Sequence, residues 1–284
     1  MLAIQSGAAW NSITPVEQLI REFDLAGNVV RETNTGIIQR QLVALGANDG
    51  GACESVPNPP PLGAGCLANF SHEIVRLPNG FTAALASIEK IFPPGTQGNT
   101  SPLPVDIIGN RVVVLDTNWQ VVWYWDSFKP DDGGAQLEIN RRAPLNEVCV
   151  SSQNFCGPVF LVSSATAPQA NEWLHGNSIY YEPATGDLLI SLRDQDWVIK
   201  VDYNNGAGSG KVLWRLGLDG DFTFKNIYND PYPWFSHQHD GIENGGSGPL
   251  TVFDNGNTRV AAPPIGLGSG NSRGMALTLD QNNM

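Results

Sequence analysis

The chain has 284 residues, of which only 15% are charged, while 31 are glycine and 20 are proline. Its 16 basic and 28 acidic residues give a formal net charge of −12, and an acidic surface repels phosphate backbones, which argues against nucleic acid as a partner. No apolar run approaches the roughly 18 residues that cross a bilayer, and the first residues lack the basic and apolar regions of a signal peptide.

One hairpin unit recurs three times along the chain. Each copy has a short apolar strand that ends in Asp, a turn with Gly or Asn, and a second β-branched strand. The copies are FDLAGNVV at 23–30, LDTNWQVVW at 115–123 and VDYNNGAGSGKVLW at 201–214. We expect Trp123 and Trp214, which lie at the ends of two copies, to pack in the core between repeated units.

A second pair of strands precedes two of these hairpins, in HEIVRLPNGFTAALAS at 72–87 and in the segment 175–202. In both segments a histidine opens a strand, and a turn and a further strand follow. Four strands per repeated unit are typical of a propeller blade. The sequence therefore predicts an all-β fold, a β-propeller with four-stranded blades. The alternative is a β-sandwich, which does not need a repeated unit.

Counting these units shows how much of a propeller the chain holds. One blade ends near Thr33, blades cover 72–127 and 175–217, and another begins at His239. A propeller needs at least four blades and closes by joining the first to the last. We therefore expect residues 1–284 to form a single β-propeller domain that is incomplete at one or both ends.

The four cysteines fall into two local pairs, Cys53 with Cys66 and Cys149 with Cys156, in loop-like stretches. Four cysteines allow three pairings, and we favour the local one because it closes short surface loops. The alternative is unpaired thiols in a reducing compartment. Two disulfides would place the protein in an oxidising compartment, the periplasm or outside the cell.

Only four histidines occur, His72, His175, His237 and His239. Three of them open strands of successive blades, and equivalent positions of a propeller's blades lie at equivalent distances from its axis. We therefore expect the histidines to converge at one channel mouth, the alternative being that polar side chains simply cap strand ends. His237 and His239 are two residues apart, so on an extended strand both side chains would face the same way.

Two further polar residues belong to the His175 segment. Arg193 ends the following strand, where it either serves the site or pairs at the surface with Asp194 or Asp196. Asn177 would face the same way as His175 and can donate an amide hydrogen bond, so we expect it to be a substrate-binding residue.

The type of ligand follows from the residues that accompany these histidines. A histidine cluster also suits zinc, but the carboxylates adjacent in sequence, Glu73 and Asp240, would point to opposite strand faces. Histidines with an arginine favour an oxyanion site without metal or cofactor. The polar turn at 254–257 has too few carboxylates for calcium. Trp173, Trp197 and Trp234 either wall an aryl pocket or belong to the core.

These segments resemble the bacterial arylsulfate sulfotransferases. In that family an arginine follows a site histidine by eighteen residues, and His175, Asn177 and Arg193 keep this pattern. HEIVRLPNG is similar to the family's earlier blade, which supplies a site histidine matching His72. HQHDGIE, LTVFDNGNTR and SRGMALTLD resemble the stretch around the nucleophilic histidine, which follows a glutamine; this selects His239 as nucleophile and leaves His237 as a substrate-binding residue.

The resemblance implies a six-bladed, periplasmic and often dimeric propeller that uses no nucleotide sulfate donor. It implies that a histidine takes the sulfuryl group from an aryl sulfate and passes it to a phenol, by a ping-pong mechanism through a sulfohistidine. Two rivals remain. The GKVLW hairpin also resembles blades of quinoprotein dehydrogenases, and a partial propeller could be a non-catalytic binding or assembly module.

Overall fold

The structure is a computed structural model that describes residues 2–5, 18–47, 62–63, 65–129, 137–150, 169–225, 229–243, 248–258, 271–282 and 284. The chain forms two compact units. The first comprises Met1–Lys129, Glu138–Arg142 and Asn146–Trp173, and the second comprises Pro130–Leu137, Ala143–Leu145 and Leu174–Met284. Strands dominate both units, so the expected all-β fold is confirmed. Assembly into a single propeller domain stays a prediction.

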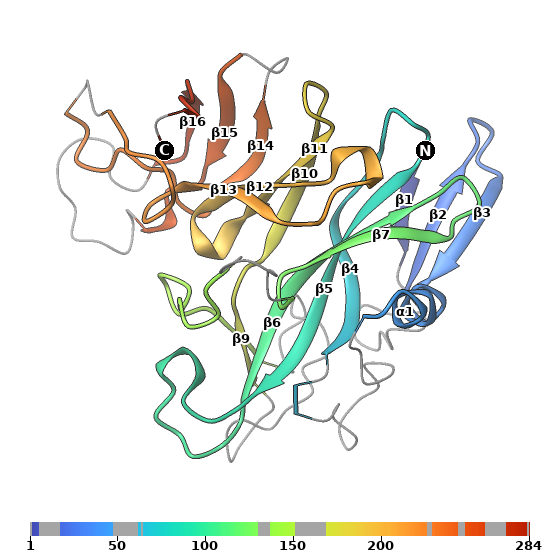
Figure 1. Cartoon of the computed structure of the whole chain (residues 1–284), viewed down its shortest axis with the longest axis horizontal. Helices are drawn as coiled ribbons and strands as arrows, with labels where there is room; N and C mark the ends of the chain where they lie inside the picture. The colour runs from blue at the N-terminus through green and yellow to red at the C-terminus, as the bar shows by residue number, and fades with distance from the viewer. Residues whose placement is uncertain are drawn as a thin grey trace. The chain divides into compact units, whose positions relative to one another are not determined.

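The first unit contains two antiparallel arrangements of strands. The smaller sheet has the order β1-β2-β3, with β1 at Leu2–Gln5, β2 at Leu19–Phe23 and β3 at Val29–Asn34. The larger sheet contains the antiparallel series β4 (Gly65–Arg76), β5 (Thr82–Phe92), β6 (Val105–Leu115) and β7 (Val121–Asp126). This series confirms the predicted four-stranded unit over 72–127, although its first strand begins earlier (Figure 1).

Two departures from the expected pattern also lie in the first unit. The start of β6 pairs in parallel with β9 (Gln169–Glu172), which pairs with β8 (Val148–Val150). The helix α1 (Thr35–Ala44) follows β3 directly. The Asn34 side chain accepts a hydrogen bond from the Ile37 backbone N–H, which is an N-cap that starts the helix.

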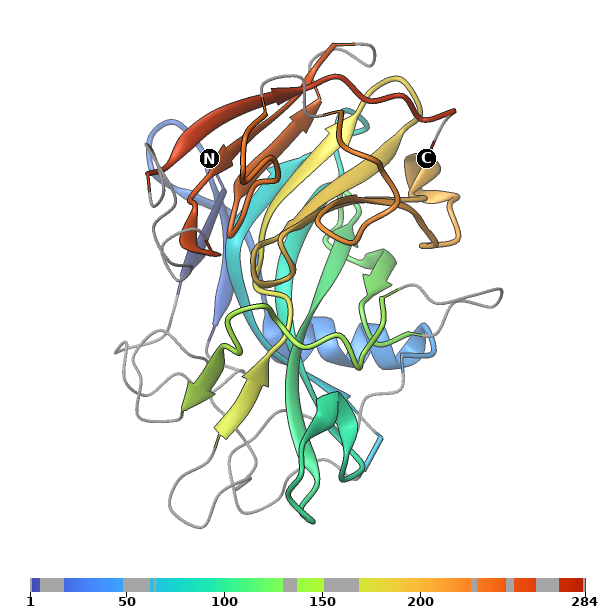
Figure 2. The same ribbon diagram turned by 90° about the vertical axis from the view of Figure 1, so that its left-hand side faces the viewer.

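The second unit holds two sheets. The first has the order β10-β11-β12-β13, with strands at Gly176–Glu182, Asp187–Leu192, Trp197–Val201 and Val212–Gly217. The second has the order β14-β15-β16, with strands at His239–Glu243, Leu250–Asp254 and Arg273–Leu277. Figure 2 shows the orange-red strands of this second sheet beside the yellow strands β10 and β11. The blade predicted over 175–217 and the blade start at His239 are both confirmed as sheets.

Short 3₁₀ helices lie at Thr96–Gly98, Arg193–Gln195 and Asn204–Gly206. The second of them, η3, joins β11 to β12 and carries residues of the candidate site.

The repeated Asp explains why each hairpin turns where it does. Asp24 and Asp116 each accept hydrogen bonds through Oδ1 from the backbone N–H groups two and four residues further along. Asp202 accepts through Oδ2 from the backbone and side chain of Ser209. A carboxylate that satisfies turn N–H groups stabilises the turn locally. All three predicted hairpins are present, with β2–β3, β6–β7 and β12–β13 paired antiparallel.

The core of the second unit joins its two sheets. Trp214, predicted to be a core residue, is 2% exposed and packs in one cluster with residues of both sheets, Leu189, Val198, Leu216, Leu250 and Val252, and with Phe235 from the segment between the sheets. Gly241 shows how close the sheets come, because a Cβ there would lie 2.8 Å from Cγ2 of Val198. This packing fixes the start of β14, where His239 lies. Trp123, in the first unit, is also buried.

The structure describes one cysteine of each predicted disulfide pair. Cys66 and Cys149 are buried, and neither is a free thiol. Their expected partners Cys53 and Cys156 lie outside the described residues, so the local pairing stays a prediction. No helix among the described residues is long and apolar enough to cross a membrane.

A buried group of charged side chains lies where β10, β11, β12 and β14 meet. Lys200 Nζ lies 2.5 Å from Glu182 Oε2 and 3.6 Å from Asp187 Oδ2, and Glu243 is 4% exposed. Burial first, then the negative charge of Glu182, raises the pKa of Glu243 above its ordinary value of 4.5. Because the folded state binds this proton more tightly, the contribution of Glu243 to stability is lost as pH rises from about 4.5 through the raised pKa.

We therefore expect Glu243→Gln to raise the free energy of unfolding by about 1 kcal/mol at pH 8, and to change it little at pH 4. The amide keeps a donor for Glu182 and cannot ionise. Urea unfolding at several pH values measures this effect. Asp221→Asn is the matched control of opposite sign, because the hydrogen bond from Arg215 lowers the pKa of Asp221; that variant should lose stability at neutral pH. A Glu243→Gln variant less stable than the wild type at pH 8 would contradict the expectation.

Candidate active site

His175 and Arg193 are brought together by the pairing of β10 with β11. His175 directly precedes β10, and its carbonyl accepts a hydrogen bond from the Arg193 backbone N–H at 3.2 Å. Arg193 begins η3 directly after β11. Both side chains are half-buried. The expectation that His175 opens a strand is therefore confirmed, and the arginine eighteen residues later lies at the same end of the same sheet.

The Arg193 guanidinium pairs with a buried carboxylate. Its Nη1 lies 2.5 Å from Oδ1 of Asp194, whose side chain is fully buried, whereas the arginine side chain keeps 21% of its surface exposed. The Asp194 backbone N–H donates to the Leu174 carbonyl at 3.0 Å. The pairing with Asp194 that spacing offered as an alternative is thus real. It anchors one edge of a guanidinium whose five N–H donors cannot all be used by one carboxylate oxygen.

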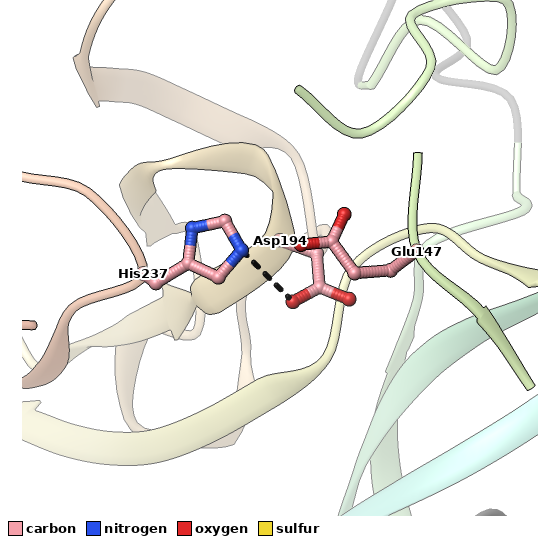
Figure 3. A group of neighbouring side chains, drawn as sticks. All are labelled: Glu147, Asp194 and His237. Carbon is pink, nitrogen blue, oxygen red and sulfur yellow. Dashed lines mark ion pairs between the residues drawn. The ribbon is translucent and has the colours of Figure 1, made fainter. Parts of the chain in front are cut away.

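His237 is fully buried between Asp194, which lies in η3, and Asp196, which directly follows η3. Its backbone N–H and its ring Nδ1 both lie within hydrogen-bonding distance of Asp196 Oδ1, at 2.7 and 3.0 Å. Its Nε2 lies 3.9 Å from Asp194 Oδ1, the ion pair drawn as a dashed line in Figure 3. Glu147, the third side chain drawn there, belongs to the first unit. His237 thereby ties the segment before β14 to η3.

His239 differs from His237 in both exposure and partner. It is half-buried, and its Nδ1 lies 3.1 Å from the side-chain oxygen Oδ1 of Asn255. The expectation that the two histidines share one extended face is wrong. His237 has φ 49° and precedes the strand, which begins at His239, so the alternation of an extended strand does not apply across this pair.

Gln238, between the two histidines, is a buried anchor. Its Nε2 donates to the Ser191 hydroxyl at 3.0 Å and to the Trp197 carbonyl at 2.8 Å. Its own carbonyl accepts from Asn177 Nδ2 at 2.7 Å. The predicted amide donor Asn177 therefore donates inside the protein, where it is 5% exposed. These bonds fix the main chain that leads into His239.

The turn after β15 holds the partner of His239. Asp254, fully buried, accepts through Oδ1 from the backbone N–H groups of Ser236 and Gly256. Its Oδ2 accepts from Arg273 Nε at 2.8 Å. The Asp254 carboxylate therefore bonds to the main chain through Oδ1 and to an arginine through Oδ2.

His72 belongs to the first unit and lies inside β4, in the irregularity of the β4–β5 register between Phe70 and Ile74. Its φ is 60° and its side chain is exposed. The expectation that His72 opens a strand is wrong, because β4 extends back to Gly65. Its convergence with the residues of the second unit stays a prediction.

The three tryptophans near the site segments have different environments. Trp173 and Trp197 are 1% and 2% exposed, and their indole N–H groups donate to the carbonyls of Arg141 and Leu218. Trp234 is half-buried and packs edge-on against Phe224. The core interpretation therefore holds for Trp173 and Trp197.

The predicted residues of the second unit thus come from the ends of its two sheets. Sequence reasoning did not assign roles to Asp196, Gln238 or Asn255. The fold is all-β, and the ends of the second unit's sheets carry the imidazoles of His175 and His239 and the guanidinium of Arg193, which are groups that can bind an oxyanion.

The chain belongs to the arylsulfotransferase family: the model of the family Arylsulfotransferase (ASST) matches residues 2–284. A search of curated proteins found no match.

The burial of His237 leads to a prediction about stability. His237→Ala should lower the free energy of unfolding by about 3 kcal/mol, because it empties the buried space between Asp194 and Asp196 and removes the ring's hydrogen bond to Asp196 Oδ1. His239→Ala, at a half-buried position with one neutral hydrogen bond, should cost about 1 kcal/mol. Chemical denaturation of both variants measures the difference. Equal losses would contradict the structural role given to His237.

Proposed function

We propose that the protein is an arylsulfate sulfotransferase that moves a sulfuryl group from an aryl sulfate to a phenolic acceptor by a ping-pong mechanism through a sulfohistidine on His239. Family membership over residues 2–284 supports this activity. The observation that carries the choice of nucleophile is the contrast between the two neighbouring histidines. His239 is half-buried with one ring nitrogen hydrogen-bonded to an amide, whereas His237 is fully buried between carboxylates.

In the first half-reaction, Nε2 of His239 attacks the sulfur of the donor. The N–S bond forms while the bond between sulfur and the aryl oxygen breaks, and the phenolate leaves with that electron pair. Negative charge grows on the departing oxygen, and cationic or hydrogen-bonding groups stabilise it. We assign this role to Arg193, His175 and His72.

In the second half-reaction the acceptor phenol attacks the sulfur of the sulfohistidine. The new S–O bond forms, the N–S bond breaks, and the phenolic proton passes to solvent or a neighbouring base. Dividing the transfer in this way replaces one difficult step with two easier ones. The proposed reaction needs no nucleotide sulfate donor and no cofactor. A periplasmic or secreted location, two local disulfides and a homodimer complete the proposal.

The test uses an aryl sulfate whose sulfate carries a heavy or radioactive label. Incubation of the protein with this donor alone should release one phenol per site and leave the label on the protein, and peptide mapping should place it on His239. An added phenol should then discharge it. Steady-state rates should give parallel lines in double-reciprocal plots, as expected for a ping-pong mechanism. Label on His237 would reverse the assignment of the nucleophile, and phenol release without protein-bound label would overturn the mechanism.

A further inference from the structure

The hydrogen bond between His239 and Asn255 specifies which nitrogen of the imidazole carries the proton. Nδ1 lies 3.1 Å from Oδ1 of the amide, and a carbonyl oxygen only accepts hydrogen bonds. With the amide oxygen toward the ring, Nδ1 is the donor, and in the neutral imidazole this leaves the lone pair on Nε2. A nucleophilic imidazole needs that lone pair on the nitrogen that faces the substrate.

Asn255 is itself held in place by the turn that carries it. On one side, Asp254 is fixed by the Ser236 backbone and by Arg273. On the other side, Gly256 adopts φ 77°, and its N–H donates to the Ser236 carbonyl at 3.0 Å. The Asn255 carbonyl accepts from the Ser272 hydroxyl at 3.2 Å. The Asn255 amide is thus held toward the ring by a turn that is hydrogen-bonded to other segments on both sides.

The neutral charge of this partner also matters. His237 faces carboxylates on both sides of its ring, whereas the His239 ring is hydrogen-bonded to an uncharged amide. A carboxylate in the same place would fix the same tautomer, but it would repel a sulfate ester, which is an anion. An amide oxygen orients the ring without adding negative charge.

We propose that Asn255 is a positioning residue that holds His239 in the Nδ1–H tautomer, so that Nε2 is the nucleophile for an aryl sulfate. This inference rests on the proposed function for its catalytic meaning. As Nε2 bonds to sulfur and the aryl oxygen departs, the ring becomes an N-sulfo-imidazolium with its proton still on Nδ1. The amide dipole stabilises the positive charge that develops there, and discharge of the sulfuryl group returns the same neutral tautomer.

The first test reads the tautomer in the resting protein and does not depend on sulfuryl transfer. Nitrogen NMR of the full chain labelled with ¹⁵N in its imidazoles resolves four histidines, and His239→Gln identifies the His239 signals. We expect a protonated Nδ1 and an unprotonated Nε2 in the wild type, and loss of this preference in Asn255→Leu. A protonated Nε2 in the wild type would overturn the inference, even if His239 accepts label from the donor.

The second test measures formation of the sulfohistidine in a single turnover. Asn255→Leu should slow it about 10–100-fold, the order of loss when the hydrogen-bond partner that orients a metal-bound histidine is removed. Asn255→Asp should keep the Nδ1–H tautomer and recover part of the rate. Asn257→Leu, in the same turn and also half-buried, is the matched control and should react like the wild type. An unchanged rate in Asn255→Leu would overturn the inference, whereas absence of label on His239 in the wild type would instead count against the proposed function.

Discussion

Replacing His239 with alanine should abolish both half-reactions, lowering sulfuryl transfer by at least about 10⁴-fold, the order expected when a covalent nucleophile is removed. The sulfuryl group then has no nitrogen on which to rest between donor and acceptor. Two measurements show this, the burst of phenol released from the donor and the mass of the protein after donor alone. The loss should not come from unfolding, because His239 is half-buried at the start of β14 and bonds to one neutral amide.

A smaller side chain at this position also permits a positive control. In His239→Gly, added imidazole can enter the space left by the ring and take the sulfuryl group in its place. We expect added imidazole to restore part of the transfer in that variant and to have no effect on the rate of the wild type. Retention of protein-bound label in His239→Ala would contradict His239 as the nucleophile.

Arg193→Ala should slow the first half-reaction by about 10²–10³-fold while leaving some activity, because a charge-stabilising donor is lost but the nucleophile remains. The guanidinium is held at one edge by Asp194 and keeps 21% of its surface exposed. Single-turnover phenol release measures the rate. Arg193→Lys should recover only part of it, since an ammonium cannot reproduce the planar fork.

Arg215 provides the matched control for Arg193. It lies in the same sheet, on β13, and stacks over Trp197 while pairing with Asp221. Arg215→Ala removes the same charge and should leave the rate of phenol release close to that of the wild type. Equal losses in the two variants would show that net charge, and not the position of Arg193, sets the rate.

Local sequence patterns were enough to predict the hairpins. Asp24 and Asp116 accept hydrogen bonds from N–H groups within four residues, so every residue that stabilises the turn lies in one short stretch of sequence. The adjacency of His175 and Arg193 was also within reach, because it needs only that two strands joined by a turn pair with each other. The helix at 35–44 was missed although its N-cap, Asn34, is visible in the sequence.

Contacts between distant segments were beyond such reasoning. Asp196 reaches His237 across 41 residues, and the bond of Asn255 to His239 depends on the pairing of β14 with β15. The shared face assumed for His237 and His239 failed because the left-handed backbone at His237 depends on tertiary contacts with η3, which no local pattern reveals.

The left-handed backbone at three of the four histidines restricts which residues evolution or a saturation library can place there. His72, His175 and His237 have φ of 60°, 48° and 49°, a region costly for β-branched side chains and tolerated by Gly and Asn. Val, Ile and Thr should therefore reduce soluble yield at all three positions. At His239, which begins a strand, the same residues suit the backbone and should fold without transferring the sulfuryl group. Sequencing the soluble and the active fractions of one library would separate residues chosen for backbone shape from those chosen for chemistry.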